Sequence, residues 1–168
     1  MTEKKQASNK ILWLFAIGQL GWAIMSGIIT NWLVFFYQPS DTAVASGAPV
    51  FFTQGAVFAG LTVIGLIAAV GRIFDAITDP WIASCSDRCK NKLGRRIPFL
   101  RWAAVPLGIV TVLVFTSPVS GQSPKNSLFL LAMDLLFYLF LTLYCTPFNA
   151  LIPELGRTQT ARVNLSTF

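Results

Sequence analysis

The stretch from residue 72 to residue 80, RIFDAITDP, places one arginine and two aspartates directly after thirty residues that carry no charge. Asp75 and Asp79 are four positions apart, so on a helix both carboxylates project to one face, about 40° apart around the axis. Thr78 borders that face, and Pro80 has no N–H and so frees a backbone carbonyl one turn earlier. An oxygen-rich group of this kind suits a hard cation such as Na⁺, or a proton held between two carboxylates that repel each other.

Arg72 stands at the edge of the same predicted face. Ionisable groups inside a membrane cost several kcal/mol, so they face a charged partner or a wet cavity. One arginine against two aspartates leaves a surplus negative charge, which a bound cation would balance. The alternative is that Arg72 and the aspartates only neutralise one another as a packing device.

The elements that must position these residues are predicted to be membrane helices. The chain has 168 residues, 54% of them hydrophobic and only 12% charged, whereas a soluble domain has roughly 25% charged residues. Four segments are long and apolar enough to cross a hydrocarbon core about 30 Å thick. We therefore expect an all-α integral membrane fold with a cytoplasmic stretch at 1–10, helices at about 11–37, 52–84, 98–117 and 128–151, and a cytoplasmic loop with the start of a fifth helix at 152–168.

The basic residues predict an orientation, because lysine and arginine in short loops are retained on the cytoplasmic side. Eleven of the thirteen fall before the first segment, between the second and third, or after the fourth. Both ends of the chain are therefore expected in the cytoplasm, and the net charge of +6 indicates topology rather than a nucleic-acid partner. The first segment is too long for the apolar region of a secretory signal, and three cysteines without a histidine do not indicate a structural zinc site.

Polar residues follow one face of two further segments. In the fourth segment they fall within about 80° of the helix circumference, and they are Asp134, Tyr138, Thr142, Cys145 and Asn149. In the first segment they fall within about 40°, and they are Gln19, Ser26, Thr30 and Tyr37, with the small Ala23 among them. Two such stripes beside a charged helix favour a shared polar cavity, although helix-to-helix hydrogen bonding would also produce them.

Two longer motifs resemble a known family. GRIFDAITDPWIASCSDRCKNKLGRRIPFL combines R-x-x-D-A-x-x-D-P with S-D-R and G-R-R-x-P-F, and PFNALIPEL follows at the end of the fourth segment. Both resemble the glycoside-pentoside-hexuronide:cation symporters, the melibiose permease-like branch of the major facilitator superfamily. The resemblance implies a twelve-helix carrier of the cell (inner) membrane that works by alternating access and is not an enzyme. It would use no cofactor and would couple Na⁺, H⁺ or Li⁺ to a sugar, glycoside or other small organic solute.

The resemblance also implies roles for single residues. Asp75, Thr78, Asp79 and Thr142 match cation-binding positions of the family. The cytoplasmic loop motif, which stabilises one conformation of the carrier and binds no substrate, is matched by Asp87, Arg88, Gly94, Arg95 and Arg96.

The substrate pocket is implied at five positions, namely Gln19, Ala23, Arg72, Cys145 and Asn149. Ala23 and Cys145 stand where melibiose-type carriers have sugar-binding aspartates, and Asn149 stands where they have a tryptophan, so a galactoside-type solute loses its usual acceptors here. Asp134 is a candidate replacement. Because 168 residues are about one third of a twelve-helix carrier, we expect the missing C-terminal helices to be a required partner and the lone chain to be inactive.

Two other classes remain as alternatives. A membrane-embedded transferase would use the D-x-x-x-D pair to hold a divalent metal, as CDP-alcohol phosphotransferases do, but their D-G-x-x-A-R block is absent around Asp75 and Asp79. A non-catalytic four-helix protein that acts by helix association would keep its function when both aspartates are replaced by asparagine.

Overall fold

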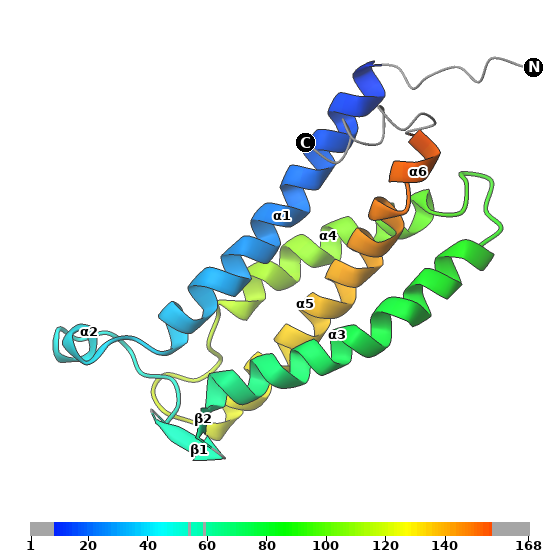
Figure 1. Cartoon of the computed structure of the whole chain (residues 1–168). Helices are drawn as coiled ribbons and strands as arrows, with labels where there is room; N and C mark the ends of the chain where they lie inside the picture. Colours follow the sequence, from blue (N-terminus) through cyan, green and yellow to red (C-terminus); the bar gives the residue numbers. More distant parts are fainter. Residues whose placement is uncertain (1–8, 54, 59, 156–168) are drawn as a thin grey trace, which may run out of the picture.

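A computed structural model of the chain describes residues 9–53, 55–58 and 60–155 (Figure 1). Apart from one small hairpin, the regular secondary structure of the described part is helical, which confirms the predicted all-α class. Its long helices are α1 (Asn9–Tyr37), α3 (Val63–Arg88), α4 (Ile97–Val114) and α5 (Pro124–Asn149). The short elements are α2 (Asp41–Ala45), β1 (Ala56–Phe58), β2 (Leu61–Thr62) and α6 (Ile152–Leu155).

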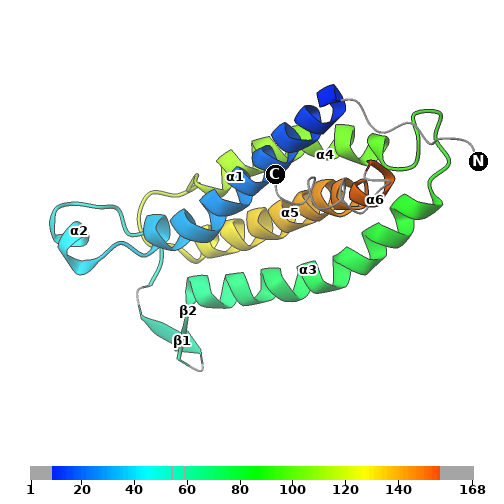
Figure 2. The same cartoon turned by 45° about the horizontal axis from the view of Figure 1, so that its top comes forward.

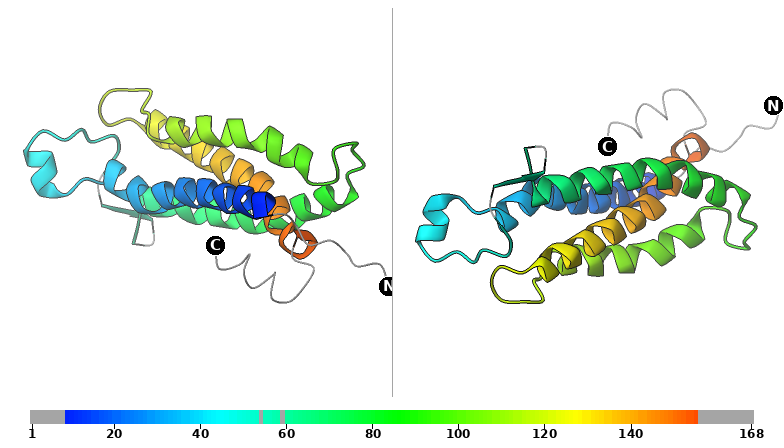
Figure 3. Two further views of the ribbon diagram at one scale, coloured as in Figure 1. Left: turned by 90° about the horizontal axis from the view of Figure 1, so that it is seen from above. Right: turned by 90° about the horizontal axis from the view of Figure 1, so that it is seen from below.

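The four long helices alternate in direction. α1 and α4 run one way, and α3 and α5 run the other way (Figure 1). α5 packs against α3 on one side and α4 on the other, an arrangement that can be followed in Figure 3, while α1 packs mainly on α4 and α5 (Figure 2). The start of α1, the α3–α4 connection and α6 lie at one end, and α2 with the hairpin lies at the other. The basic α3–α4 connection and the start of α1 therefore share an end, as the charge pattern predicted.

Three of the helices are long and apolar enough to cross a membrane, spanning Lys10–Tyr37, Ile97–Val114 and Pro124–Asn149. α3 has 26 residues, which gives it a length of about 39 Å. It differs from the other three because Arg72, Asp75 and Asp79 lie in its middle.

The predicted start of the second helix, near residue 52, is wrong. α3 begins at Val63, and the residues before it form the β1–β2 hairpin. Gly55 and Gly60 have φ angles of 101° and 80°, which a helix cannot accommodate and which glycine adopts without steric cost. Thr62 then caps α3, because its hydroxyl accepts a hydrogen bond from the Gly65 N–H at 3.1 Å.

Other boundaries shift by fewer residues. α5 begins at Pro124 rather than near 128, because Ser123 provides the N-cap and proline is compatible with the first helical turn. α4 ends at Val114 instead of near 117. The expected outer loop after α1 contains the short helix α2, which Ser40 caps. The predicted cytoplasmic loop with the start of a fifth helix, at 152–168, lies mostly outside the described residues; residues 152–155 form the short helix α6.

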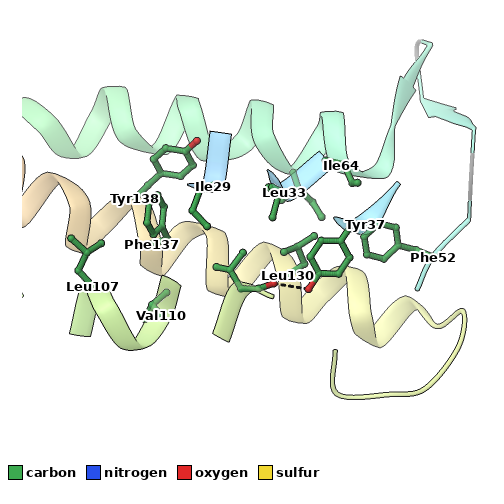
Figure 4. Close-up of a cluster of buried hydrophobic side chains, with 12 residues drawn as sticks. Ile29, Leu33, Tyr37, Phe52, Ile64, Leu107, Val110, Leu130, Phe137 and Tyr138 are labelled. Atoms are coloured by element: carbon green, nitrogen blue, oxygen red, sulfur yellow. Dashed lines mark hydrogen bonds between the residues drawn. The ribbon is translucent and has the colours of Figure 1, made fainter. Parts of the chain in front are cut away.

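A buried apolar cluster joins all four long helices towards the hairpin end (Figure 4). Its buried members include Ile29 and Leu33 of α1, Ile64 of α3, Leu107 of α4 and Leu130 of α5.

Tyr37, at the end of α1, is 1% exposed, and its hydroxyl donates to the Val114 carbonyl at 2.6 Å. That carbonyl belongs to the last turn of α4, where helix carbonyls lack an intrahelical partner. Tyr37 was predicted to lie on a polar stripe that favours a shared cavity, with helix-to-helix hydrogen bonding as the alternative. Its bond from α1 to α4 agrees with the alternative.

At the opposite end, α1 meets α5 through aromatic rings. Phe15 stacks on Phe148 with ring centroids 4.4 Å apart. Gly18 makes room for this contact, since a Cβ at that position would lie 2.8 Å from a Phe148 ring carbon.

Candidate functional site

Asp75 and Asp79 of α3 each accept a hydrogen bond from a threonine of α5. Thr142 Oγ1 donates to Asp75 Oδ1 at 2.7 Å, and Thr146 Oγ1 donates to Asp79 Oδ1 at 3.3 Å. Both pairs are separated by 67 positions in sequence. This is expected for two parallel helices, because residues four positions apart lie on the same side of a helix. We call these four residues the α3–α5 ladder.

The ladder is not uniformly exposed. Thr142 is 2% exposed and Asp75 is partly buried, whereas Asp79 is exposed. The inner bond is therefore both the shorter and the better shielded from solvent, which makes it the stronger of the two. The outer carboxylate keeps open coordination sites for a ligand.

Thr78 lies in the same helix as the aspartates but contributes differently. It is 8% exposed, and its hydroxyl lies 3.1 Å from the Phe74 carbonyl and 3.2 Å from the Asp75 carbonyl, to either of which it can donate. The hydroxyl proton is thus used within α3, and the oxygen lone pairs remain available. Its role as a cation ligand stays a prediction.

Arg72 does not neutralise the aspartates by direct contact. Its guanidinium carbon lies 5.3 Å from the centre of the Tyr138 ring, a cation–π distance. In the described part of the chain, the ion pair within 4 Å is between Asp87 and Arg96. The packing-device alternative, in which Arg72 pairs with the two carboxylates, therefore disagrees with the geometry.

The predicted pocket residues are not brought together around one hollow in the described residues. Gln19 accepts a hydrogen bond from Trp22 Nε1 at 3.2 Å, and Ala23 is exposed on α1. Asn149 donates to Cys145 Sγ at 3.3 Å on α5. A hollow of about 170 Å³ between α1, α4 and α5 is lined by other residues, among them Gly18, Gly21, Trp22, Met25 and Tyr144.

The cytoplasmic loop motif connects the end of α3 to the start of α4. Arg96 Nη2 lies 3.4 Å from Asp87 Oδ1, which joins the two helix ends. Gly94 has a φ of 98°, a conformation that side chains other than glycine rarely adopt. Arg88 lies in the last turn of α3, where a cation interacts favourably with the helix dipole, and Arg95 is exposed.

Sequence reasoning missed Thr146. Considered on α5 alone, it lies about 120° from Asp134 and so falls off the predicted stripe. The available signal was the matching spacing: Thr142 and Thr146 are four apart, as are Asp75 and Asp79. The sequence also did not predict the burial of Asp134, which is 1% exposed. This burial places the carboxyl out of a solute's reach in this structure.

Comparison with known proteins identifies the family. A family model described as MFS/sugar transport protein matches residues 14–168. The chain belongs to this family, which consists of membrane transporters rather than enzymes. No solved structure matches the chain.

The curated relatives are considerably longer. An uncharacterised symporter of Synechocystis is 30% identical over 171 residues, covering 99% of this chain and 28% of the relative. An isoprimeverose transporter of Lactiplantibacillus pentosus is 25% identical over 83% of the chain and 26% of the relative. A raffinose carrier protein of Pediococcus pentosaceus is 26% identical over 64% of the chain and 17% of the carrier. The chain thus spans a quarter to a third of the first two relatives.

Proposed function

We propose that the four long helices form the cation-binding part of a symporter that moves a small organic solute by alternating access. The observation that carries the proposal is the α3–α5 ladder, in which two carboxylates and two hydroxyls meet between parallel helices. Family membership supports transport, and the symporters among the relatives support coupling to a cation.

The chemistry of the ladder favours a small hard cation or a proton. Carboxylate and hydroxyl oxygens are the ligands that such cations prefer. Asp75 and Asp79 together carry one negative charge more than Arg72 can balance, and Arg72 is engaged by Tyr138. Na⁺, Li⁺ or H⁺ at the ladder would supply the missing charge, with Thr78 as a further candidate oxygen ligand beside Asp75, Asp79, Thr142 and Thr146.

We infer a sugar or glycoside as the solute class. The named relatives include an isoprimeverose transporter and a raffinose carrier. The candidate lining is Gln19, Ala23, Arg72, Cys145 and Asn149. Cys145 follows Thr142 by three residues on α5, so a solute at Cys145 and Asn149 would lie one turn from the cation. This proximity is what coupling between the two ligands requires.

We also infer the placement in the cell membrane. The end that holds the start of α1, the basic α3–α4 connection and α6 is assigned to the cytoplasm, because basic loops are retained on that side. The bilayer and the remaining helices of a longer carrier are then the partners of the exposed apolar surface of α1 and α4.

The test measures ion-stimulated uptake. The protein encoded by the complete reading frame is reconstituted in proteoliposomes, and uptake from a panel of labelled oligosaccharides is compared under an inward Na⁺ gradient, a proton gradient or neither. Asp75→Asn and Asp79→Asn should each abolish ion stimulation, whereas Asp41→Asn, an exposed aspartate in α2, should retain it.

Ion-stimulated transport that persists in both asparagine variants would refute the cation site. If every variant behaves like the unaltered protein in every assay, the alternative of a protein that acts only by helix association gains support. Direct Na⁺ titration of the detergent-solubilised protein by calorimetry separates loss of ion binding from loss of solute binding.

A further inference from the structure

Asp134 of α5 is a buried carboxyl that the ladder does not use. It is 1% exposed, and neither of its oxygens has a hydrogen-bond partner among the described residues. It lies eight residues before Thr142, about 12 Å along the axis of α5 from the inner rung of the ladder.

The carboxyl is directed into the contact between α5 and α3. Gly71 of α3 lies directly opposite: a Cβ at that position would be 2.6 Å from Asp134 Oδ2 and 2.7 Å from a Tyr138 ring carbon. The missing side chain of Gly71 thus provides the space that the carboxyl occupies. On this side the carboxyl faces the Gly71 position beside the Tyr138 ring, and neither of its oxygens has a hydrogen-bond partner in the described residues.

The charges near Asp134 do not pair with it. Arg72 is near enough to interact electrostatically, but its guanidinium stacks over Tyr138, and in the described residues Asp134 forms no ion pair within 4 Å. On the other side of α5, the buried α4 residues are apolar except Thr111, whose hydroxyl donates to the Leu107 carbonyl.

An ionised carboxylate in these surroundings would be unpaired and desolvated, which costs several kcal/mol or more. A bound metal cation would need several oxygen ligands, and the hydroxyl and carboxylate oxygens of the ladder lie further along both helices. A proton needs only the carboxyl itself, and it leaves a neutral group whose burial is far less costly.

We propose that Asp134 is a proton-binding site of this protein, separate from the α3–α5 ladder. The carboxylate takes up one proton from solution and becomes a neutral carboxylic acid between α3 and α5. The proton is released only when α3 and α5 separate enough to hydrate Asp134 or to let Arg72 reach it. This inference does not depend on the proposed cation site, since no ladder residue contributes to it.

Infrared spectroscopy tests the proposal directly. The 168-residue chain is placed in lipid bilayers, and the difference spectrum between it and Asp134→Asn is recorded at neutral pH. The expected result is one protonated-carboxyl C=O band that is present in the unaltered chain, absent in Asp134→Asn and shifted in D₂O. The matched control is Asp87→Asn at the exposed end of α3, which should leave this band unchanged.

A chain with no protonated-carboxyl band at neutral pH would overturn the proposal, whatever the variants do. If Asp134→Asn fails to insert, Gly71→Ala replaces it: the added Cβ must displace the carboxyl, so the band should shift in frequency, and an unmoved band would assign it to another residue.

Unfolding provides the second measurement. At about pH 3, below the usual aspartate pKa of roughly 3.9, the chain and Asp134→Asn should unfold at similar denaturant concentrations, because the carboxyl is then neutral in both the folded and the unfolded chain. As the pH is raised, the unaltered chain should lose stability relative to Asp134→Asn. An advantage of Asp134→Asn that does not grow between about pH 4 and neutral pH would show that Asp134 ionises as readily in the folded chain as in the unfolded chain, and would overturn the proposal.

Discussion

Replacing Thr142 by valine isolates the inner rung of the ladder. Valine keeps the branched shape of threonine and removes the hydroxyl that donates to Asp75 Oδ1 at 2.7 Å. A hydrogen bond to a charged group contributes about 1.5–3 kcal/mol in proteins, whereas bonds between membrane helices average about 0.6 and reach about 1.7 kcal/mol. Because Thr142 is 2% exposed and its acceptor is a carboxylate, we expect a loss near the top of the membrane range, about 1.5 kcal/mol.

The outer rung provides the matched control. Thr146 Oγ1 lies 3.3 Å from Asp79 Oδ1, and this bond is exposed. A longer and solvated bond is weaker, so Thr146→Val should cost no more than about 0.5 kcal/mol. The ratio between the losses of unfolding free energy in the two variants, rather than either loss alone, tests whether the inner bond is the stronger one.

The assay is a double-mutant cycle measured by denaturant unfolding in detergent micelles. Thr142→Val, Asp75→Ala and the double variant should give a coupling energy of about 1 kcal/mol or more, because each single change removes the same bond, whereas asparagine at position 75 would keep an acceptor oxygen. The corresponding cycle for Thr146 and Asp79 should give a coupling close to zero. A coupling near zero for Thr142 and Asp75, or a larger value for the outer pair, would refute the reasoning.

Two further substitutions test close packing and capping. Gly71→Ala should destabilise the chain by about 1–3 kcal/mol, because its Cβ would lie 2.6 Å from Asp134 Oδ2; Gly21→Ala, with nothing within 4 Å, should be neutral or stabilising in the same unfolding assay. Tyr37→Phe should cost about 1–2 kcal/mol, because it leaves the Val114 carbonyl without its 2.6 Å donor. An unchanged unfolding midpoint for Gly71→Ala or Tyr37→Phe would contradict the corresponding contact.

The acidic face of α3 could be predicted from the sequence because it depends only on helical periodicity. Asp75 and Asp79 are four residues apart, so any continuous helix places them on one side. The family resemblance implied Thr142 as a cation-site position but not its hydrogen bond to Asp75. Thr146 was missed because a single helix does not reveal its register against another, and here that register is a constant 67 positions.

The sequence predictions that failed concern features that depend on contacts distant in sequence or on backbone angles. Tyr37 lies among polar residues on the α1 circumference, but its acceptor is 77 positions away at the end of α4. The start of α3 was misplaced because residues 52–62 are almost as apolar as a helix, and only the positive φ angles of Gly55 and Gly60 turn this stretch into a hairpin. Apolar composition predicts burial in lipid but not the path of the backbone.

The three acidic residues between α3 and α5 form a gradient of burial. Asp134 is 1% exposed, Asp75 is partly buried and Asp79 is exposed. The free energy of keeping a charge rises with burial, so the three positions favour different occupants. The innermost carboxyl favours a proton, which removes its charge, while Asp75 and Asp79 each accept a hydrogen bond from a hydroxyl of α5. Any movement of α3 and α5 that hydrates Asp134 would therefore release a proton while a cation stays bound at the ladder.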